Sequence, residues 1–162
     1  MLKKNRKTKV AGKGFHVAIV AAEYNARYVN GMLKAAQSYL DEQGAEVTVV
    51  RVPGAFEIPA VAAHFAEDQS TDAVICLGLI LEGVTAHADH IGKAVTDGLV
   101  LLQINYKKPV IHEVLLVKDL EHARVRCLSQ EHNKGTEAAQ TALKMCRLMR
   151  KLPPSLVVLP AE

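Results

Sequence analysis

The chain has 162 residues, of which 49% are hydrophobic and 23% charged, and this is the balance of one folded domain and not of a disordered chain. The net charge is only +3, and six Lys and Arg residues fall within the first thirteen positions, so the rest of the sequence is nearly neutral. No apolar stretch approaches the roughly 20 residues of a membrane span, and no apolar segment typical of a secretory signal follows the basic N-terminus, so we expect a cytoplasmic protein.

Three regions are expected along the chain. Residues 1–14 form a basic, flexible N-terminal arm, residues 15–151 an α/β domain, and residues 152–162 a C-terminal tail that contains a Pro-Pro pair. The arm has no interleaved aromatic residue, and no recognisable nucleic-acid-binding module follows it. We therefore do not expect nucleic acid as a partner, although a DNA-binding arm stays open as an addition to the function of the domain.

Strand-like and helix-like patterns alternate through the domain. Apolar, β-branched runs predict strands over 15–21, 46–52, 72–79 and 110–117. Apolar residues at helical spacing predict helices over 27–43, 58–67, 87–105, 119–128 and 136–151. This alternation favours a three-layer α/β sandwich, in which a central, four-stranded, mainly parallel sheet is flanked by helices.

Two kinds of site are not indicated by the sequence. The cysteines Cys76, Cys127 and Cys146 are odd in number and far apart, so we expect buried free thiols and neither disulfides nor a zinc knuckle. The Gly-Lys-Gly cluster at 12–14 lacks the spacing of a phosphate loop or a dinucleotide fingerprint. We therefore expect no nucleotide cofactor.

Three loops at the carboxyl ends of predicted strands carry unusual residues, and in a parallel sheet such loops converge on one crevice. They are 23–25, 53–59 and 80–90. In the second loop Gly54 lets a ligand approach the backbone, while Phe56 and Ile58 offer apolar walls that suit a flat heterocycle. The alternative is a simple Pro-Gly turn, with Glu57 placed to open a helix.

The third loop suits an anion and a proton-transfer residue. Gly83, Val84 and Thr85 directly precede a helix start, where free backbone N–H groups favour phosphate. His87 follows in the first turn, either as a proton shuttle or as ordinary polar surface. His87 and His90 with the intervening Asp89 also permit a metal site. The spacing is incomplete as a zinc signature, because no distant residue is an obvious further ligand, so we expect no metal.

Two cations lie further along the chain. Arg126 falls in the helix that Asp119 is expected to cap, and Lys134 precedes the last predicted helix. Their residue types leave two interpretations open, because both side chains are equally suited to solvent and to a phosphate group.

Four motifs, taken in order and spacing, resemble those of the 6,7-dimethyl-8-ribityllumazine synthase family. They are VPGAFEIP at 52–59, LGxxxxGxTxH at 77–87, ExAxxR ending at Arg126, and NKGxEAA at 133–139. The adjacent Tyr24 and Asn25 are similar to the aromatic-Asn pair that follows the first strand in that family. The resemblance runs from about residue 15 to residue 149.

The resemblance implies condensation of 5-amino-6-ribitylaminouracil with 3,4-dihydroxy-2-butanone 4-phosphate, without cofactor or metal, in a homo-pentamer or a multiple of one. It implies that Tyr24 stacks on the pyrimidine, that 55–58 hold the ring and the ribityl chain, and that 83–85 bind phosphate with Arg126. His87 would move protons, with Lys134 assisting. The implied catalytic residues are His87, Arg126 and Lys134, and the implied substrate-binding residues are Tyr24, Asn25, Gly54, Ala55, Phe56, Glu57, Ile58, Leu79, Ile80, Leu81, Gly83, Val84, Thr85 and His112.

The sequence departs from the family pattern at several positions in and beside these motifs. Glu82 stands where a basic residue is usual, Ala88 where an aromatic often follows the histidine, and His112 with Glu113 where the family usually has Phe and Gly. A second interpretation is therefore a non-catalytic relative that keeps the assembly and binds a flavin or lumazine, and a third is an unrelated phosphate-binding α/β domain. The joint presence of His87, Arg126 and Lys134 favours the enzyme.

Overall fold

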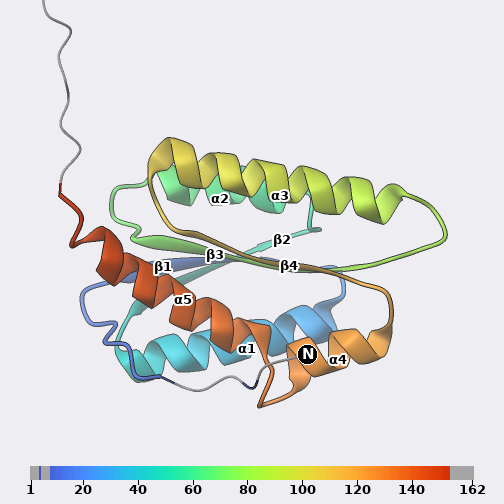
Figure 1. Ribbon diagram of the computed structural model, residues 1–162, viewed down its shortest axis with the longest axis horizontal. Helices are drawn as coiled ribbons and strands as arrows, with labels where there is room; N and C mark the ends of the chain where they lie inside the picture. The colour runs from blue at the N-terminus through green and yellow to red at the C-terminus, as the bar shows by residue number, and fades with distance from the viewer. Residues whose placement is uncertain (1–3, 5–7, 154–162) are drawn as a thin grey trace, which may run out of the picture.

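The computed structural model describes residue 4 and residues 8–153, which form a three-layer α/β sandwich (Figure 1). The elements in chain order are β1 (His16–Ala22), α1 (Ala26–Gln43), β2 (Glu46–Val52), α2 (Ile58–Glu67), β3 (Ala73–Leu81), α3 (His87–Tyr106), β4 (Val110–Val117), α4 (Leu120–Leu128) and α5 (Lys134–Met149). The four strands are ordered β2-β1-β3-β4 and every neighbouring pair is parallel. The predicted fold class is confirmed.

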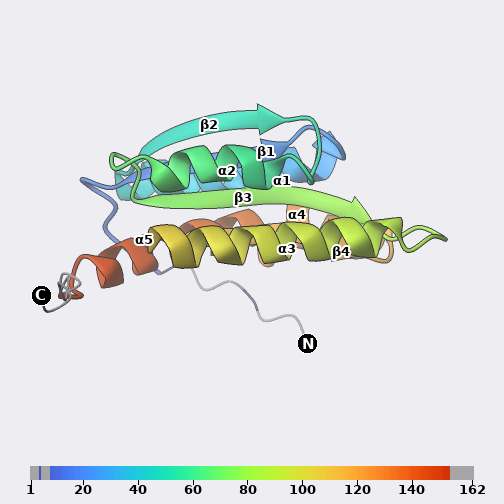
Figure 2. The same ribbon diagram turned by 90° about the horizontal axis from the view of Figure 1, so that it is seen from above.

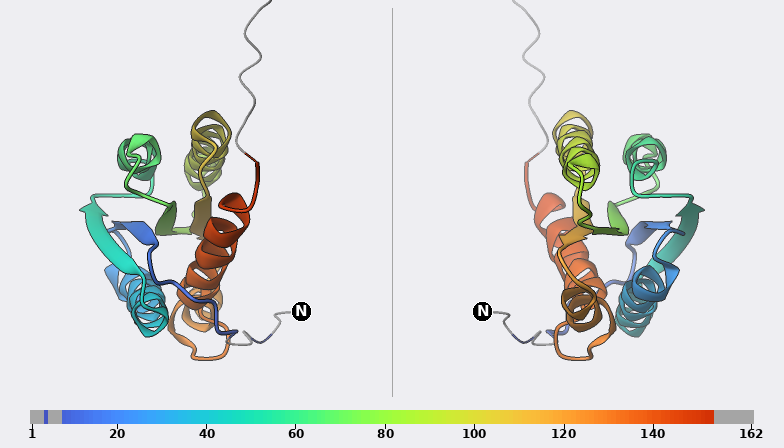
Figure 3. Two further views of the ribbon diagram at one scale, coloured as in Figure 1. Left: turned by 90° about the vertical axis from the view of Figure 1, so that its left-hand side faces the viewer. Right: turned by 90° about the vertical axis from the view of Figure 1, so that its right-hand side faces the viewer.

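The helices divide between the two faces of the sheet. α2 and α3 cover one face, while α1, α4 and α5 cover the other, and both layers are visible in the end-on views (Figure 3). The arrowheads of β2 and β3 point the same way, so the carboxyl ends of the strands meet at one edge of the sheet (Figure 2). This edge is where a parallel sheet offers its binding crevice.

A separate hydrophobic core lies on each face of the sheet. The residues of β3 from Ala73 to Ile80 are buried, as expected for a central strand covered on both sides. Alternate β3 side chains enter opposite cores, Ile75 with the α1 and α5 side and Cys76 with the α2 and α3 side. The three cysteines are buried free thiols, as the sequence predicted, and burial raises the pKa of each of them.

Local capping explains where the helix boundaries differ from the predicted ones. The Asn133 side chain accepts a hydrogen bond from the backbone N–H of Gly135, so α5 begins at Lys134, two residues before its predicted start, and it also ends two residues earlier, at Met149. Asp119 lies outside α4 and caps it by accepting a hydrogen bond from the backbone N–H of His122. Strand β3 runs two residues beyond its predicted end because Leu81 still pairs with Val117 of β4.

The part of the N-terminal arm that the structure describes contacts the domain. The side chain of Val10 is buried in the core, and its backbone N–H donates to the side-chain oxygen of Gln43 at 3.1 Å. The backbone N–H of Gly12 donates to the Gln43 carbonyl at 2.9 Å. The boundary placed at residue 14 stays a prediction, and most of the tail over 152–162 lies outside the described residues. Within the described part, no helix is long and apolar enough to cross a membrane.

Candidate functional site

A cavity of about 860 Å³ opens at the carboxyl edge of the sheet. It is lined by residues that follow β1 and β2, by the end of β3, and by the start of α3. Twelve of the residues singled out in the sequence line it: Tyr24, Asn25, Gly54, Ala55, Phe56, Glu57, Leu79, Ile80, Leu81, Gly83, Thr85 and His87. The fold therefore brings the three predicted loops to one site.

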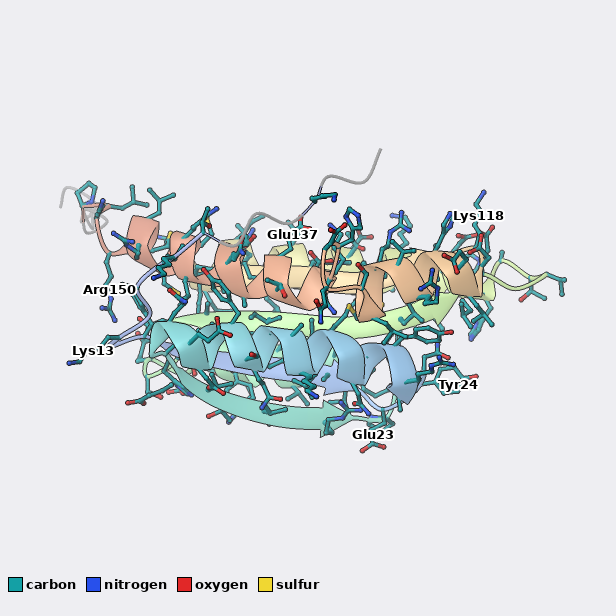
Figure 4. All side chains as sticks on the ribbon, turned by 90° about the horizontal axis from the view of Figure 1, so that it is seen from below. Lys13, Glu23, Tyr24, Lys118, Glu137 and Arg150 are labelled. Carbon is teal, nitrogen blue, oxygen red and sulfur yellow. The ribbon has the colours of Figure 1, made fainter. Side chains whose placement is uncertain are left out.

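Asn25 fixes the loop after β1. Its side-chain nitrogen donates to the Leu79 carbonyl of β3 at 2.7 Å, and its backbone is left-handed with φ of 57°. Asparagine tolerates this conformation better than most residues. The backbone N–H of Tyr24 donates to the Pro53 carbonyl at 3.1 Å, which joins the first loop to the second. Tyr24 thus projects at the same end of the molecule as Lys118, far from Lys13 and Arg150 (Figure 4).

The second loop combines an exposed aromatic side chain, Phe56, with a buried side chain, Ile58, that holds the loop to the core. Ile58 is fully buried in the core below α2, and its backbone N–H donates to the Ala55 carbonyl at 3.2 Å. Phe56 is 61% exposed and Tyr24 is 73% exposed, although both line the cavity. Two exposed aromatic rings beside one cavity are typical of a site for a flat, partly apolar ligand.

The third loop leads into the start of α3, which no side chain caps. The backbone N–H of Glu82 donates to the Val117 carbonyl at 2.9 Å, and the chain then turns through Gly83 to the helix at His87. Residue Ala86 occupies the N-cap position and supplies no side-chain hydrogen bond. The first backbone N–H groups of α3 therefore have no side-chain cap, and together with the helix dipole they favour an anion beside His87.

Four further lining residues were not among the predicted site residues. Ala88, His90, Ile91 and Ala94 join His87 along the start of α3. His87, His90, Ile91 and Ala94 have the spacing of one helix face, which means that this face of α3 forms a wall of the cavity. Extending the helical spacing from His87 into the predicted helix would have found His90, Ile91 and Ala94.

Five predicted site residues do not line this cavity. Ile58 is the buried anchor already described, and Val84 is fully exposed. His112 lies 2.9 Å, through Nε2, from the Thr96 hydroxyl and lines a second cavity of about 310 Å³ between α3 and β4. Arg126 on α4 and Lys134 on α5 belong to the opposite layer, where the Lys134 ammonium pairs with Glu137 Oε2 at 2.7 Å. Their assignment to the site stays a prediction.

A largely buried carboxyl group lies near Lys134. Glu113 on β4 is directed to the α5 side of the sheet, as are Ile111 and Val117 of the same strand. The pKa of Glu113 is raised to about 7, mainly by burial, while the charge of Lys134 lowers it and the charge of Glu137 raises it by smaller amounts. This carboxyl group is a departure from the family pattern with a measurable electrostatic consequence.

Metal-binding side chains do not gather in the part of the chain that the structure describes. Across residue 4 and residues 8–153, no three His, Cys, Asp or Glu residues are placed to hold one ion. The ionisable lining of the cavity consists of Glu57, His87, His90 and Tyr24. These groups can transfer protons and accept hydrogen bonds, which is the chemistry of an acid-base site.

Comparisons with known proteins point to one family. The profile of the family described as 6,7-dimethyl-8-ribityllumazine synthase matches residues 14–150. A protein of that name from Aquifex aeolicus (strain VF5) is 35% identical over 147 residues, covering 89% of this chain and 96% of the relative. Those from Stenotrophomonas maltophilia (strain K279a) and Porphyromonas gingivalis (strain ATCC 33277) are 37% identical over 139 residues and 39% identical over 142 residues. They cover 84% and 86% of this chain, and 90% and 88% of the respective relatives.

Proposed function

Since this chain belongs to the 6,7-dimethyl-8-ribityllumazine synthase family, we propose that it condenses 5-amino-6-ribitylaminouracil with 3,4-dihydroxy-2-butanone 4-phosphate to 6,7-dimethyl-8-ribityllumazine, a step of riboflavin biosynthesis. The observation that carries the proposal is the cavity at the carboxyl edge of the sheet, where two exposed aromatic rings lie beside an uncapped helix start that bears a histidine. The non-catalytic alternative is not favoured.

The proposal assigns two kinds of substrate contact to the residues that line the cavity. Tyr24 and Phe56 bind the pyrimidine through their ring faces, and the backbone of the loop around Ala55 holds the ribityl chain. The backbone at Gly83 and Thr85 receives the phosphate at the start of α3. His87 then moves protons as the imine forms and the phosphate group leaves.

The complete site is shared between two copies of the chain in this proposal. Within the described residues no Lys or Arg lines the cavity, whereas a phosphorylated substrate needs cationic partners. Arg126 and Lys134 are the proposed partners, and we assign them, with the stretch around His112, to the neighbouring subunit.

An exposed apolar stripe on α3 supports such an assembly. Val100, Leu101 and Ile104 are 44%, 56% and 63% exposed and lie close together along the helix. Apolar residues grouped in this way are typical of a surface that another chain covers. The proposed assembly is a homo-pentamer or a multiple of one.

The activity is tested by mixing the purified protein with both substrates and following lumazine absorbance and phosphate release. The proposal expects both products in equal amounts, with no added nucleotide and in the presence of a chelator. Binding of lumazine or flavin without turnover would instead establish the non-catalytic alternative. Loss of the rate on chelation, restored by a metal ion, would contradict the cofactor-free mechanism.

The shared site is tested by mixing two inactive variants. His87→Ala and Arg126→Ala subunits, each inactive alone, should regenerate some activity when co-assembled, because a fraction of the sites would carry both intact residues. No recovered activity in verified mixed assemblies would reject the shared site, as would full activity in a proven monomer.

A further inference from the structure

The cavity contains a second imidazole for which the proposed function has no role. His90 lies one helical turn after His87 on α3, and both side chains line the cavity. The rise of an α-helix separates the two positions by about 4.5 Å along its axis. Asp89, between them in sequence, does not line the cavity, so the two histidines share this wall without an adjacent carboxylate from α3.

These two imidazoles differ from most other histidines of the chain because their ring nitrogens are not engaged. No described residue forms a hydrogen bond or an ion pair with the ring of His87 or of His90. Four histidines are held elsewhere by hydrogen bonds, an ion pair or another contact: His16, His112, His122 and His132. His64 lies in the last turn of α2 against the ring of Phe65, outside the cavity.

Exposure also indicates that His90 contributes little to packing. The residue is exposed, and its backbone N–H donates to the Ala86 carbonyl at 3.0 Å as part of the first helical turn. This backbone bond survives any change of side chain. Among the described residues, the His90 ring therefore has no hydrogen-bond partner and no place in the core, which leaves it available to a bound ligand.

We propose that His90 is a second catalytic proton-transfer residue, which works with His87 on the same condensation. The proposal rests on the proposed function. His87 lies beside the helix start that receives the phosphate, whereas His90 lies one turn further along the wall, towards Ala94. The pair therefore places one imidazole near the phosphate and one near the remainder of the bound substrates.

The condensation includes several proton transfers that two imidazoles could carry out. When the amine adds to the ketone, the C–N bond forms, one N–H proton leaves the nitrogen, and the carbonyl oxygen becomes a hydroxyl group. When the imine forms, the second N–H proton leaves, the C–O bond breaks, and the hydroxyl takes up a proton and departs as water. A neutral imidazole accepts each N–H proton while an imidazolium supplies the proton to oxygen, and proton exchange through water resets the pair.

Replacing His90 by alanine tests the proposal, with His64→Gln as the matched control outside the cavity. The wild-type rate is measured first. We expect His90→Ala to lower kcat by about 10- to 100-fold, with KM for either substrate changed less than about 3-fold, because proton transfer and not binding is lost. Added imidazole should restore part of the His90→Ala rate, since the truncated side chain leaves room for it in the cavity. His64→Gln should keep the wild-type rate, and both variants should keep the wild-type assembly size and thermal unfolding midpoint.

The outcomes separate the two proposals. A wild-type protein without turnover would overturn the proposed function and this inference with it. An active wild type with an equally active His90→Ala variant would overturn this inference alone. A reduced rate that imidazole does not restore, or that comes with a lowered unfolding midpoint, would assign His90 a structural role and would also overturn it.

Discussion

Replacing Glu113 by glutamine should stabilise the protein at alkaline pH and leave its stability nearly unchanged at acidic pH. Glu113 is mostly buried between β4 and α5, and burial is the main reason that its pKa is raised to about 7. Lys134 offsets only part of this burial cost because its ammonium already pairs with Glu137 at 2.7 Å. Glutamine has nearly the same shape and carries no charge, so the variant removes the charge and keeps the volume.

The magnitude follows from the difference between the folded and unfolded states. In the unfolded chain the pKa of this carboxyl group is about 4.5, and in the folded protein it is about 7. Each tenfold change in proton affinity is worth about 1.4 kcal/mol, so ionised Glu113 lowers the free energy of unfolding by at most about 3 to 4 kcal/mol. The folded protein binds the proton more tightly, so stability falls as pH rises from 4.5 to 7. Above pH 7 the loss is complete.

The assay is urea unfolding of wild type and Glu113→Gln at pH 5 and at pH 8.5. Protein concentration is held constant because the proposed assembly would make stability depend on it. We expect the variant to gain about 1 to 3 kcal/mol at pH 8.5 and much less at pH 5. Glu67→Gln, on the exposed surface of α2, is the control and should change little at either pH. An equal gain for Glu113→Gln at both pH values would refute the electrostatic reasoning.

Three further predictions follow from the site and the core. His87→Ala should slow turnover by about 10- to 10⁴-fold while the thermal unfolding midpoint stays unchanged, and an unaltered rate would remove His87 from its role. Arg126→Ala should raise KM for the phosphorylated ketone far more than KM for the pyrimidine, since each lost charge-assisted bond is worth about 1.5 to 3 kcal/mol, and equal changes would contradict this assignment. Gly135→Ala should lower the free energy of unfolding by on the order of 3 kcal/mol, because the added Cβ would lie 1.9 Å from the Met32 carbonyl oxygen. Gly92→Ala, whose Cβ would have its nearest neighbour at 3.8 Å, is the control, and an equal effect would contradict the packing argument.

The order and type of the elements could be predicted because they depend on local patterns. The apolar run at 73–79 predicted a buried central strand, and Gly44 predicted the end of α1, where it adopts φ of 78°. Boundaries were less accurate where a side chain or a partner strand decides them. Asn133 starts α5 two residues early, and pairing with β4 extends β3 to Leu81.

The site could be predicted in part, because the carboxyl ends of parallel strands must meet at one edge. This rule predicts that Tyr24, Phe56 and His87 lie around one crevice, and all three line the cavity. The sequence interpretation used His90 only as a doubtful metal ligand and gave Glu113 no electrostatic role. Helical spacing from His87 could have placed His90 on the same face, whereas the burial of the Glu113 carboxyl group depends on distant segments and has no local signal.

The sequence by itself determined the alternation of strands and helices, the parallel sheet that this alternation favours, and the three loops whose residues line the cavity. These features follow from hydrophobic period, from backbone preferences of Gly, Pro and Asn, and from the direction of parallel strands. Only the tertiary structure decided which wall of α3 faces the cavity and that Arg126 and Lys134 lie in the opposite layer from α3. The physical reason is that the packing of the helices on the two faces of the sheet fixes how each helix is rotated about its axis, which side chains are buried and which charges lie near them. No short segment of the sequence contains that information.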